Sequence, residues 1–134
     1  MKQHSAKYRV YYEDTDAGGV VYYGNYLKFV ERARTDFLRD SGTDHTILAE
    51  KTNSFFVVRK AEVEYLFPGR LDDMIEVKTE IVKIGRSSID MKQDCYNQNG
   101  IKLADVFIQI VCVTNDGNKI RSTKLPDDLI KHFS

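Results

Sequence analysis

The chain has no tryptophan, only two cysteines and three histidines, and no excess of either charge, since 20 lysines and arginines stand against 20 aspartates and glutamates. The missing tryptophan carries no functional information. The balanced charge excludes the global positive field that is typical of proteins binding nucleic acid or anionic membranes. No run approaches the ~20 apolar residues of a membrane-spanning helix.

The two cysteines form none of the common redox or metal motifs. Cys95 and Cys112 lie in separate strand-like segments, with neither a CxxC pair nor a cluster of ligands nearby. We therefore expect two reduced, buried thiols and no bound metal or cofactor. The first five residues, MKQHS, lack the apolar core of a secretion signal. From these features we expect a cytoplasmic protein.

A chain of 134 residues predicts one domain, spanning residues 1–134, that buries roughly two-thirds of its unfolded surface. No repeat or linker interrupts it. Apolar residues at three- and four-residue steps predict a helix of about fifteen residues from Asn25, between Gly24 and Ser41-Gly42 as cap and stop signals. Its predicted apolar face includes Tyr26 and Leu27. Alternation and turn signals predict strands at 6–13, 55–67, 74–84, 87–96 and 101–114, with shorter helical segments at 46–51 and 125–133.

These elements indicate an α+β fold, in which one long helix packs on one face of an antiparallel sheet of about five strands. Four strands joined by short turns predict successive hairpins, and the apolar run 106–113 predicts a central strand. We expect the other face, to which we assign Thr79 and Gln93, to be too polar for a second layer. Open sheet edges invite a second copy, so we predict a homodimer or a dimer of dimers, that is, a homotetramer.

The segment from Asp14 to Tyr26 combines two carboxylates, three glycines and three tyrosines between a strand and the long helix. A calcium loop starting at Asp14 is excluded, because its fifth and twelfth positions hold Gly18 and Asn25 instead of an oxygen ligand and a glutamate. A plain turn is the structural alternative, since aspartate and glycine are common turn residues.

The wider pattern favours a functional loop. The string Tyr11–Tyr22, then Asn25-Tyr26 and Glu31–Arg34, is similar to the signature of the 4-hydroxybenzoyl-CoA thioesterase family. It most resembles the Tol–Pal-associated acyl-CoA thioesterase branch, which the segments 56–60, 63–65 and 70–73 also match. The similarity covers about residues 8–125.

This resemblance implies a hotdog fold, in which a sheet wraps a long helix, and active sites shared between subunits of a dimer or tetramer. It implies acyl-CoA thioester hydrolysis with Asp16 as the catalytic carboxylate. The branch commonly carries histidine where this chain has Tyr23. A tyrosine is a poor base at neutral pH, so the resemblance leaves open whether the Tyr23 side chain or only its N–H takes part.

A thioester carbonyl needs an oxyanion donor and either a nucleophile or an activated water. The N–H groups of Tyr23 and Gly24 at the helix start are candidate donors, and Asp16 is the candidate nucleophile or general base. Since coenzyme A carries phosphates, Arg59, Lys60 and Arg86 are candidate substrate-binding cations, with solvated strand charges as the alternative. The acyl group, aliphatic or aromatic, stays open.

Two other functions compete with thioester hydrolysis. A hotdog hydratase would need a histidine near the helix, and no histidine lies between His4 and His45. A non-catalytic module that binds acyl thioesters or an acyl carrier protein in envelope or lipid metabolism would retain Asp16 for loop shape. The three histidines are isolated in the sequence, and we expect each at the surface.

Overall fold

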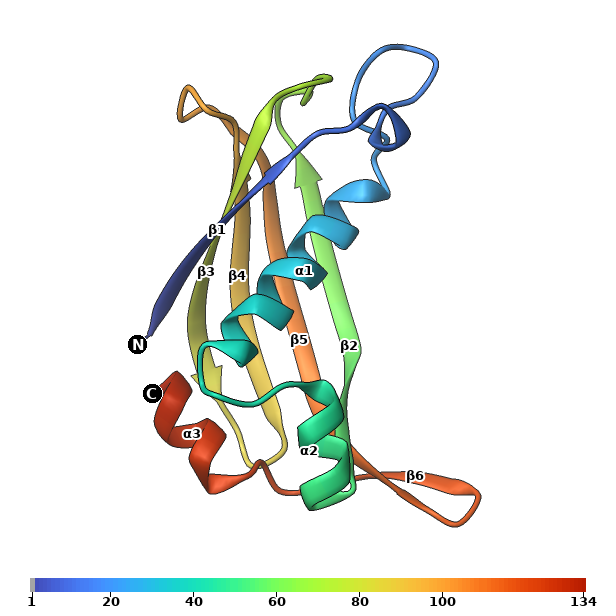
Figure 1. Cartoon of the computed structure of the whole chain (residues 1–134), viewed down its shortest axis with the longest axis vertical. Helices are drawn as coiled ribbons and strands as arrows, with labels where there is room; N and C mark the ends of the chain where they lie inside the picture. The colour runs from blue at the N-terminus through green and yellow to red at the C-terminus, as the bar shows by residue number, and fades with distance from the viewer. Residues whose placement is uncertain (1) are drawn as a thin grey trace.

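The computed structural model describes residues 2–134, in which one sheet surrounds one long helix (Figure 1). In chain order the elements are β1 (Gln3–Arg9), the 3₁₀ turn η1 (Tyr12–Asp14), α1 (Asn25–Arg39), α2 (His45–Thr52), β2 (Ser54–Tyr65), β3 (Met74–Ile84), β4 (Ser88–Tyr96), β5 (Lys102–Asp116), β6 (Lys119–Ser122) and α3 (Asp127–Phe133). The helix wrapped by an antiparallel sheet confirms the expected α+β architecture.

The sheet has six strands in the order β1-β3-β4-β5-β2, with β6 paired to β5, and every pair is antiparallel. The prediction of successive hairpins was wrong at one place, because β2 pairs with β5 rather than with β3. The segment 66–73 does not turn back on β2. It packs on the chain before α1, where Val21 N–H donates to Gly69 O (2.8 Å) and Asp72 N–H donates to Val10 O (3.1 Å).

Helix α1 begins after Gly24 and spans the predicted fifteen residues. Its apolar stripe, which includes Phe29, Val30 and Phe37, is buried against the concave face of the sheet. Beyond its end, Gly42 adopts a positive φ of 88°, which suits glycine in the left-handed region. Leu27 was assigned to the buried face, but it is 41% exposed because it lies at the edge of the stripe.

Two polar residues lie on the helix-facing side of the sheet, which corrects our assignment of Thr79 and Gln93 to the other face. Gln93 Nε2 donates to Val30 O of α1 and to Thr79 Oγ1, both at 3.0 Å, and Gln93 Oε1 accepts from Arg34 Nη1 at 2.9 Å. Burial is tolerated here because each group has a partner.

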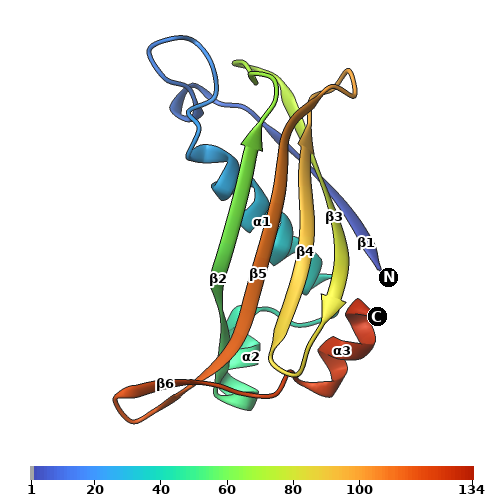
Figure 2. The same ribbon diagram turned by 180° about the vertical axis from the view of Figure 1, so that it is seen from behind.

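The remaining strands agree with the sequence in the middle of the sheet and differ at its margins. Strands β3 and β4 match within one residue, and β5 is central as predicted, paired on both sides by β4 and β2 (Figure 2). Strand β1 begins earlier than expected, and β6 was not predicted. Cys95 and Cys112 are free and buried, as expected. Over the described part of the chain, no helix has the length and apolarity to cross a membrane.

Candidate active site

The loop from Asp14 to Gly24 is built around the buried carboxylate of Asp14. Its Oδ1 accepts from Asn25 Nδ2 and its Oδ2 from the Tyr11 N–H, both at 2.8 Å. Asp14 therefore joins the chain before the loop to the first residue of α1. This carboxylate is 4% exposed, and its two bonds give it a structural role in the loop.

Asp16 lies two residues further on and is exposed. Its Oδ1 accepts from the Gly18 N–H at 2.8 Å, and its own N–H donates to Val20 O at 2.9 Å. A Cβ on Gly18 would come within 3.2 Å of Asp16 Oδ1, so the close approach of backbone and carboxylate favours glycine. The second oxygen, Oδ2, accepts no hydrogen bond from residues 2–134 and is available to a ligand.

The start of α1 supplies free donors. Among residues 2–134, the backbone N–H groups of Tyr23 and Gly24 donate no hydrogen bond, as is usual for the first turn of a helix. The helix dipole adds a partial positive charge at this end. An oxyanion placed here would receive both donors, which agrees with the role expected for Tyr23 and Gly24.

Tyr65, at the end of β2, contacts Tyr23 directly before the start of α1. Its hydroxyl donates to Tyr23 O at 2.9 Å, and its ring makes an edge contact with the Tyr23 ring, with centroids 6.1 Å apart. Because a peptide unit is planar, a hydrogen bond to Tyr23 O also orients the Gly24 N–H on the opposite side of the same unit. Burial raises the pKa of the Tyr65 hydroxyl, so it remains a donor at neutral pH.

Asp16 and Tyr23 face a common groove of about 340 Å³ between the loop and the end of β2. Tyr26, Tyr65 and residues 66–68 form its apolar wall. Sequence reasoning missed this wall, because it read Tyr65–Phe67 as the continuation of a strand. The signal was the apolar triplet Tyr65-Leu66-Phe67 directly before Pro68, since three consecutive apolar residues do not fit a half-exposed strand.

The three cations predicted for coenzyme A are not gathered around Asp16. Arg59 occupies a β-bulge of β2, where the pairing register with β5 shifts, and is exposed. Lys60 pairs with Glu62 at 2.9 Å, which favours the solvated-strand alternative for this residue. Arg86 lies in the turn between β3 and β4, at the end of the sheet opposite the loop of residues 14–24 (Figure 1).

Arg86 has cationic neighbours that sequence reasoning missed. Its carbonyl accepts from the Leu125 N–H at 2.9 Å, so the turn lies beside the chain that leaves β6. Strand β6 and this segment carry three exposed cations, Lys119, Arg121 and Lys124. Arg121 lies 3.9 Å from Asp116, and Lys124 lies 3.3 Å from Asp127. The four-residue strand β6 has no buried residue and hence no alternating pattern to reveal it.

The histidine side chains do not all lie at the surface, contrary to our expectation. The His4 ring is largely buried, stacks on Phe37 with centroids 4.8 Å apart and pairs with Asp40 at 2.9 Å, so its placement at the surface was wrong. His45 lines a second cavity under α1. In residues 2–134, no group of three or more His, Cys, Asp or Glu side chains is arranged to hold a metal ion.

Comparison of the sequence with known proteins identifies the family of this chain. The family model described as "Thioesterase superfamily" matches residues 18–104. Acyl-CoA thioester hydrolase YbgC of Escherichia coli O6:H1 is 44% identical over 126 residues, which cover 93% of this chain and 91% of that protein. Acyl-CoA thioesterase YbgC of Haemophilus influenzae is 37% identical and covers 93% of this chain and 90% of its own length.

Solved structures agree on the fold. A probable thioesterase from Bartonella henselae superposes with a TM-score of 0.84 at 35% identity, covering 93% of this chain and all of the other. A mutant 4-hydroxybenzoyl-CoA thioesterase in complex with 4-hydroxybenzoyl-CoA superposes with a TM-score of 0.93 over the whole of both chains; at 18% identity this shows the hotdog fold alone. On the family model and the YbgC relatives together, the chain belongs to the thioesterase superfamily.

Proposed function

We propose that this protein is an acyl-CoA thioesterase, which hydrolyses an acyl-CoA thioester to a free acid and coenzyme A. One observation carries the assignment to a site: the Asp16 carboxylate and Tyr23, at the N-terminus of α1, line one groove. The relatives named acyl-CoA thioester hydrolase support the same reaction.

In this proposal, the thioester carbonyl oxygen accepts from the free N–H groups of Tyr23 and Gly24. These donors and the helix dipole stabilise the negative charge that develops on the oxygen. Asp16 then acts in one of two ways. It attacks the carbonyl carbon, expels the thiolate of coenzyme A and forms a mixed anhydride that water hydrolyses, or it accepts a proton from a water that attacks directly.

Single turnover in ¹⁸O-labelled water, combined with hydroxylamine trapping, separates these two routes. Label in the peptide containing Asp16, or a hydroxamate formed on Asp16, identifies the nucleophilic route through the anhydride. Label only in the released acid, with no hydroxamate on Asp16, identifies the general base route.

We place the coenzyme A phosphates, as part of this proposal, at the end of the sheet that carries Arg86 and, on β6, Lys119 and Arg121. In a single chain this end of the sheet lies opposite the loop of Asp16, so a substrate that uses both needs two subunits. The exposed edge strand β2 supports such an assembly, because its outer backbone groups are unpaired within residues 2–134. We therefore propose a homodimer or dimer of dimers.

A thiol-release assay with a panel of acyl-CoAs and acyl carrier protein thioesters tests the function. Turnover with an acyl preference supports the proposal. Tight binding without thiol release would instead establish a non-catalytic binding module. Sedimentation velocity tests the assembly, and a monomer that is fully active would contradict the two-subunit site. The two free thiols and the acyl-CoA substrate support a cytoplasmic location, which fractionation would test.

A further inference from the structure

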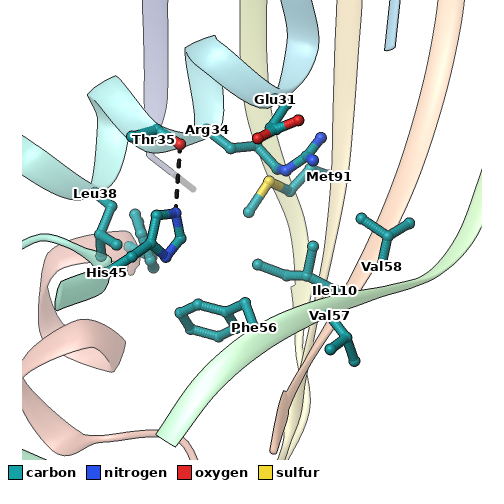
Figure 3. A pocket seen from close by; sticks show the side chains of 11 residues that line it. Glu31, Arg34, Thr35, Leu38, His45, Phe56, Val57, Val58, Met91 and Ile110 are labelled. Atoms are coloured by element: carbon teal, nitrogen blue, oxygen red, sulfur yellow. Dashed lines mark hydrogen bonds between the residues drawn. The ribbon is translucent and has the colours of Figure 1, made fainter. Parts of the chain in front are cut away.

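Helix α1 borders two cavities, which differ in how much of their wall is buried within one chain. The cavity at Arg34, of about 210 Å³, lies beneath the C-terminal half of α1 (Figure 3). The edge strand β2 lines it, and at this edge we place the partner subunit. The groove at Asp16 lies at the other end of the helix. Two residues that line this groove, Val21 and Tyr26, are 5% and 3% exposed, so their packing is set within one chain.

Residues 66–73 form the crossover from β2 to β3, and Gly69 in this crossover joins the start of α1 to the loop that carries Asp16. On one side, the Gly69 N–H donates to the Tyr26 hydroxyl at 3.1 Å. On the other side, Gly69 O accepts from the Val21 N–H at 2.8 Å. Within residues 2–134, the bond to Tyr26 is the one hydrogen bond between α1 and the crossover. Gly69 therefore fixes the loop relative to the helix.

The space around Gly69 is closed on three sides. A Cβ at this position would lie 3.0 Å from Val21 Cγ2, 3.1 Å from Tyr26 Oη and 3.3 Å from Leu103 Cδ1. These separations are shorter than an ordinary van der Waals contact, so a side chain here would displace the loop or the tyrosine. Gly69 has no positive φ, and the requirement for glycine is one of space.

The position of Val21 determines that of Asp16, because the loop is closed on itself. Val20 O accepts from the Asp16 N–H at 2.9 Å, and Val21 pairs with Thr15 across the loop in an isolated β-bridge. Residues 16–19 are exposed and extend beyond these contacts. The place of the Asp16 carboxylate therefore depends on what holds Val21.

The crossover is itself anchored away from the loop. At its start, the N–H groups of Leu66 and Phe67 donate to Leu103 O on β5, at 2.9 and 3.3 Å. At its end, the carboxylate of Asp73 accepts from Gln98 Nε2 in the turn between β4 and β5, at 3.1 Å. Since both ends are fixed to the sheet, the crossover can support the loop.

Tyr26 lies in the first turn of α1, three residues after Tyr23. Burial raises the pKa of its hydroxyl, so the group keeps its proton at neutral pH and accepts from Gly69 through a lone pair. Its ring packs on Tyr65, with centroids 5.6 Å apart, and the Tyr65 hydroxyl donates to Tyr23 O. Two adjacent tyrosines thus hold the two parts of the site, Tyr65 the N–H donors and Tyr26 the loop.

We propose that Tyr26 is a positioning residue for the reaction at Asp16, an inference that rests on the proposed thioesterase function. Its hydroxyl, through Gly69 and Val21, sets the distance between the carboxylate and the free N–H groups at the start of α1. The rate of a reaction between positioned groups depends steeply on their separation. A small displacement of the loop should therefore slow the chemical step without weakening the binding of coenzyme A.

Tyr26→Phe tests the proposal, because it removes the hydroxyl and keeps the ring. In acyl-CoA hydrolysis kcat should fall about three- to tenfold, the effect of one lost hydrogen bond, with KM within about twofold of the wild type. A rise in KM at unchanged kcat would mean that Tyr26 contributes to substrate binding, and it would overturn the proposal. Wild-type values of both constants would overturn it as well.

Tyr8→Phe is the matched control. The Tyr8 hydroxyl donates to Asp36 of α1 in a partly buried hydrogen bond, so this variant also loses a bond between a tyrosine and a neighbouring element. Asp36 is twelve residues beyond Gly24, or about 18 Å along the helix. Tyr8→Phe should lower the unfolding temperature and leave kcat unchanged. Equal losses of kcat in the two variants would attribute the effect to stability and refute the positioning role.

Gly69→Ala tests the same contact from the crossover. Its methyl group would press on Val21 and Tyr26, so kcat should fall at least as far as in Tyr26→Phe, again with little change in KM. An unchanged kcat in a folded Gly69→Ala would contradict the proposal. Should Tyr26→Phe fail to fold, Gly69→Ala decides.

Nuclear magnetic resonance separates this inference from the proposed function. In Tyr26→Phe the amide resonances of Asp16 and Val20 should shift more than in Tyr8→Phe, whatever reaction the protein catalyses. A wild type without thioesterase activity would defeat the proposed function, while shifted loop resonances would still establish the coupling from Tyr26 to Asp16. Loop resonances that do not move in Tyr26→Phe would refute the coupling.

Discussion

Both oxygens of the Asp14 carboxylate accept hydrogen bonds inside the loop, whereas Asp16 accepts one from Gly18 and keeps its second oxygen open. The two carboxylates are two positions apart in the sequence, so their residue type and spacing could not separate them. What separates them is the fold of the loop, which turns Asp14 toward Asn25 and Asp16 toward the groove. This contrast predicts different consequences for the same substitution.

Asp16→Asn should retain the fold and lower kcat for acyl-CoA hydrolysis by about 10²–10⁴-fold, the usual contribution of a positioned acid or base. The amide is nearly isosteric but is neither a base nor a useful nucleophile. Steady-state thiol release measures the loss, and thermal unfolding checks the fold. Glu13→Gln, an exposed neighbour, is the control and should leave kcat unchanged. Wild-type turnover by Asp16→Asn would remove Asp16 from the mechanism.

Asp14→Asn should act on stability instead. A buried carboxylate that accepts from both Tyr11 N–H and Asn25 Nδ2 loses one acceptor when it becomes an amide, and the amide N–H₂ then faces a donor. We expect a loss of about 1–3 kcal/mol in the free energy of unfolding, measured by urea denaturation. Asp16→Asn should cost far less in the same experiment, and an equal cost would contradict the division of roles.

Tyr65→Phe tests whether the orientation of the Tyr23-Gly24 peptide matters to the reaction. It removes the hydrogen bond to Tyr23 O, worth about 0.5–1.5 kcal/mol, so kcat should fall about three- to tenfold with little change in KM. Tyr23→Phe removes a hydroxyl but keeps the Tyr23 N–H, and should have the smaller effect. If Tyr23→Phe costs more than Tyr65→Phe, the Tyr23 hydroxyl itself takes part in the reaction.

At the scale of single elements, the link between α1 and the sheet runs through Gln93. Gln93→Leu would remove the acceptor of Arg34 and the donor of Val30 O, leaving buried polar groups unpaired. We expect a loss of about 1–3 kcal/mol in the free energy of unfolding. Gln109→Leu is a matched control, because Gln109 lies half-buried on a strand and bonds only Asp90. Equal losses would show that the link to α1 contributes no more than a surface contact.

An element could be predicted from the sequence when the pattern that indicates it lies within one continuous segment. The start and approximate length of helix α1 were predicted, since its apolar stripe and the glycines at both ends lie within one continuous segment. The pairing of β2 with β5 could not be predicted, because the paired residues are 39 (Tyr65 with Ala104) to 60 (Ser54 with Thr114) positions apart and carry no shared local signal. Pro68-Gly69 looked like a hairpin turn but opens a crossover that packs on Val10 and Val21.

The candidate site divides in the same way. Asp16, Tyr23 and Gly24 were predicted because they belong to one short motif. Tyr65 and the apolar wall were missed because they reach the loop only through the crossover. The cavity at Arg34 was missed because its walls come from several separate elements.

At the scale of the whole molecule, the core should make the protein sensitive to alkaline pH. Cys95 is completely buried between the sheet and α1, and burial raises the pKa of its thiol from 9.0 to about 12. Above pH 9 the unfolded chain releases this proton while the folded chain keeps it, so each further pH unit favours unfolding. Stability from this group is therefore complete below pH 9 and declines between pH 9 and about 12.

The expected slope for one proton is about 1.4 kcal/mol per pH unit. Burial raises the pKa of Tyr8 and Cys112 as well, so the wild type should lose stability with the combined slope of these groups. Cys95→Ala should reduce the slope by the amount of one proton, because alanine cannot titrate. The variant should start from a lower stability at pH 8, because its smaller side chain fills less of the core. Urea denaturation at a series of pH values measures both slopes. Parallel stability curves for the wild type and Cys95→Ala would mean that Cys95 ionises in the folded state, and hence that the core opens to solvent at a pH well below 12.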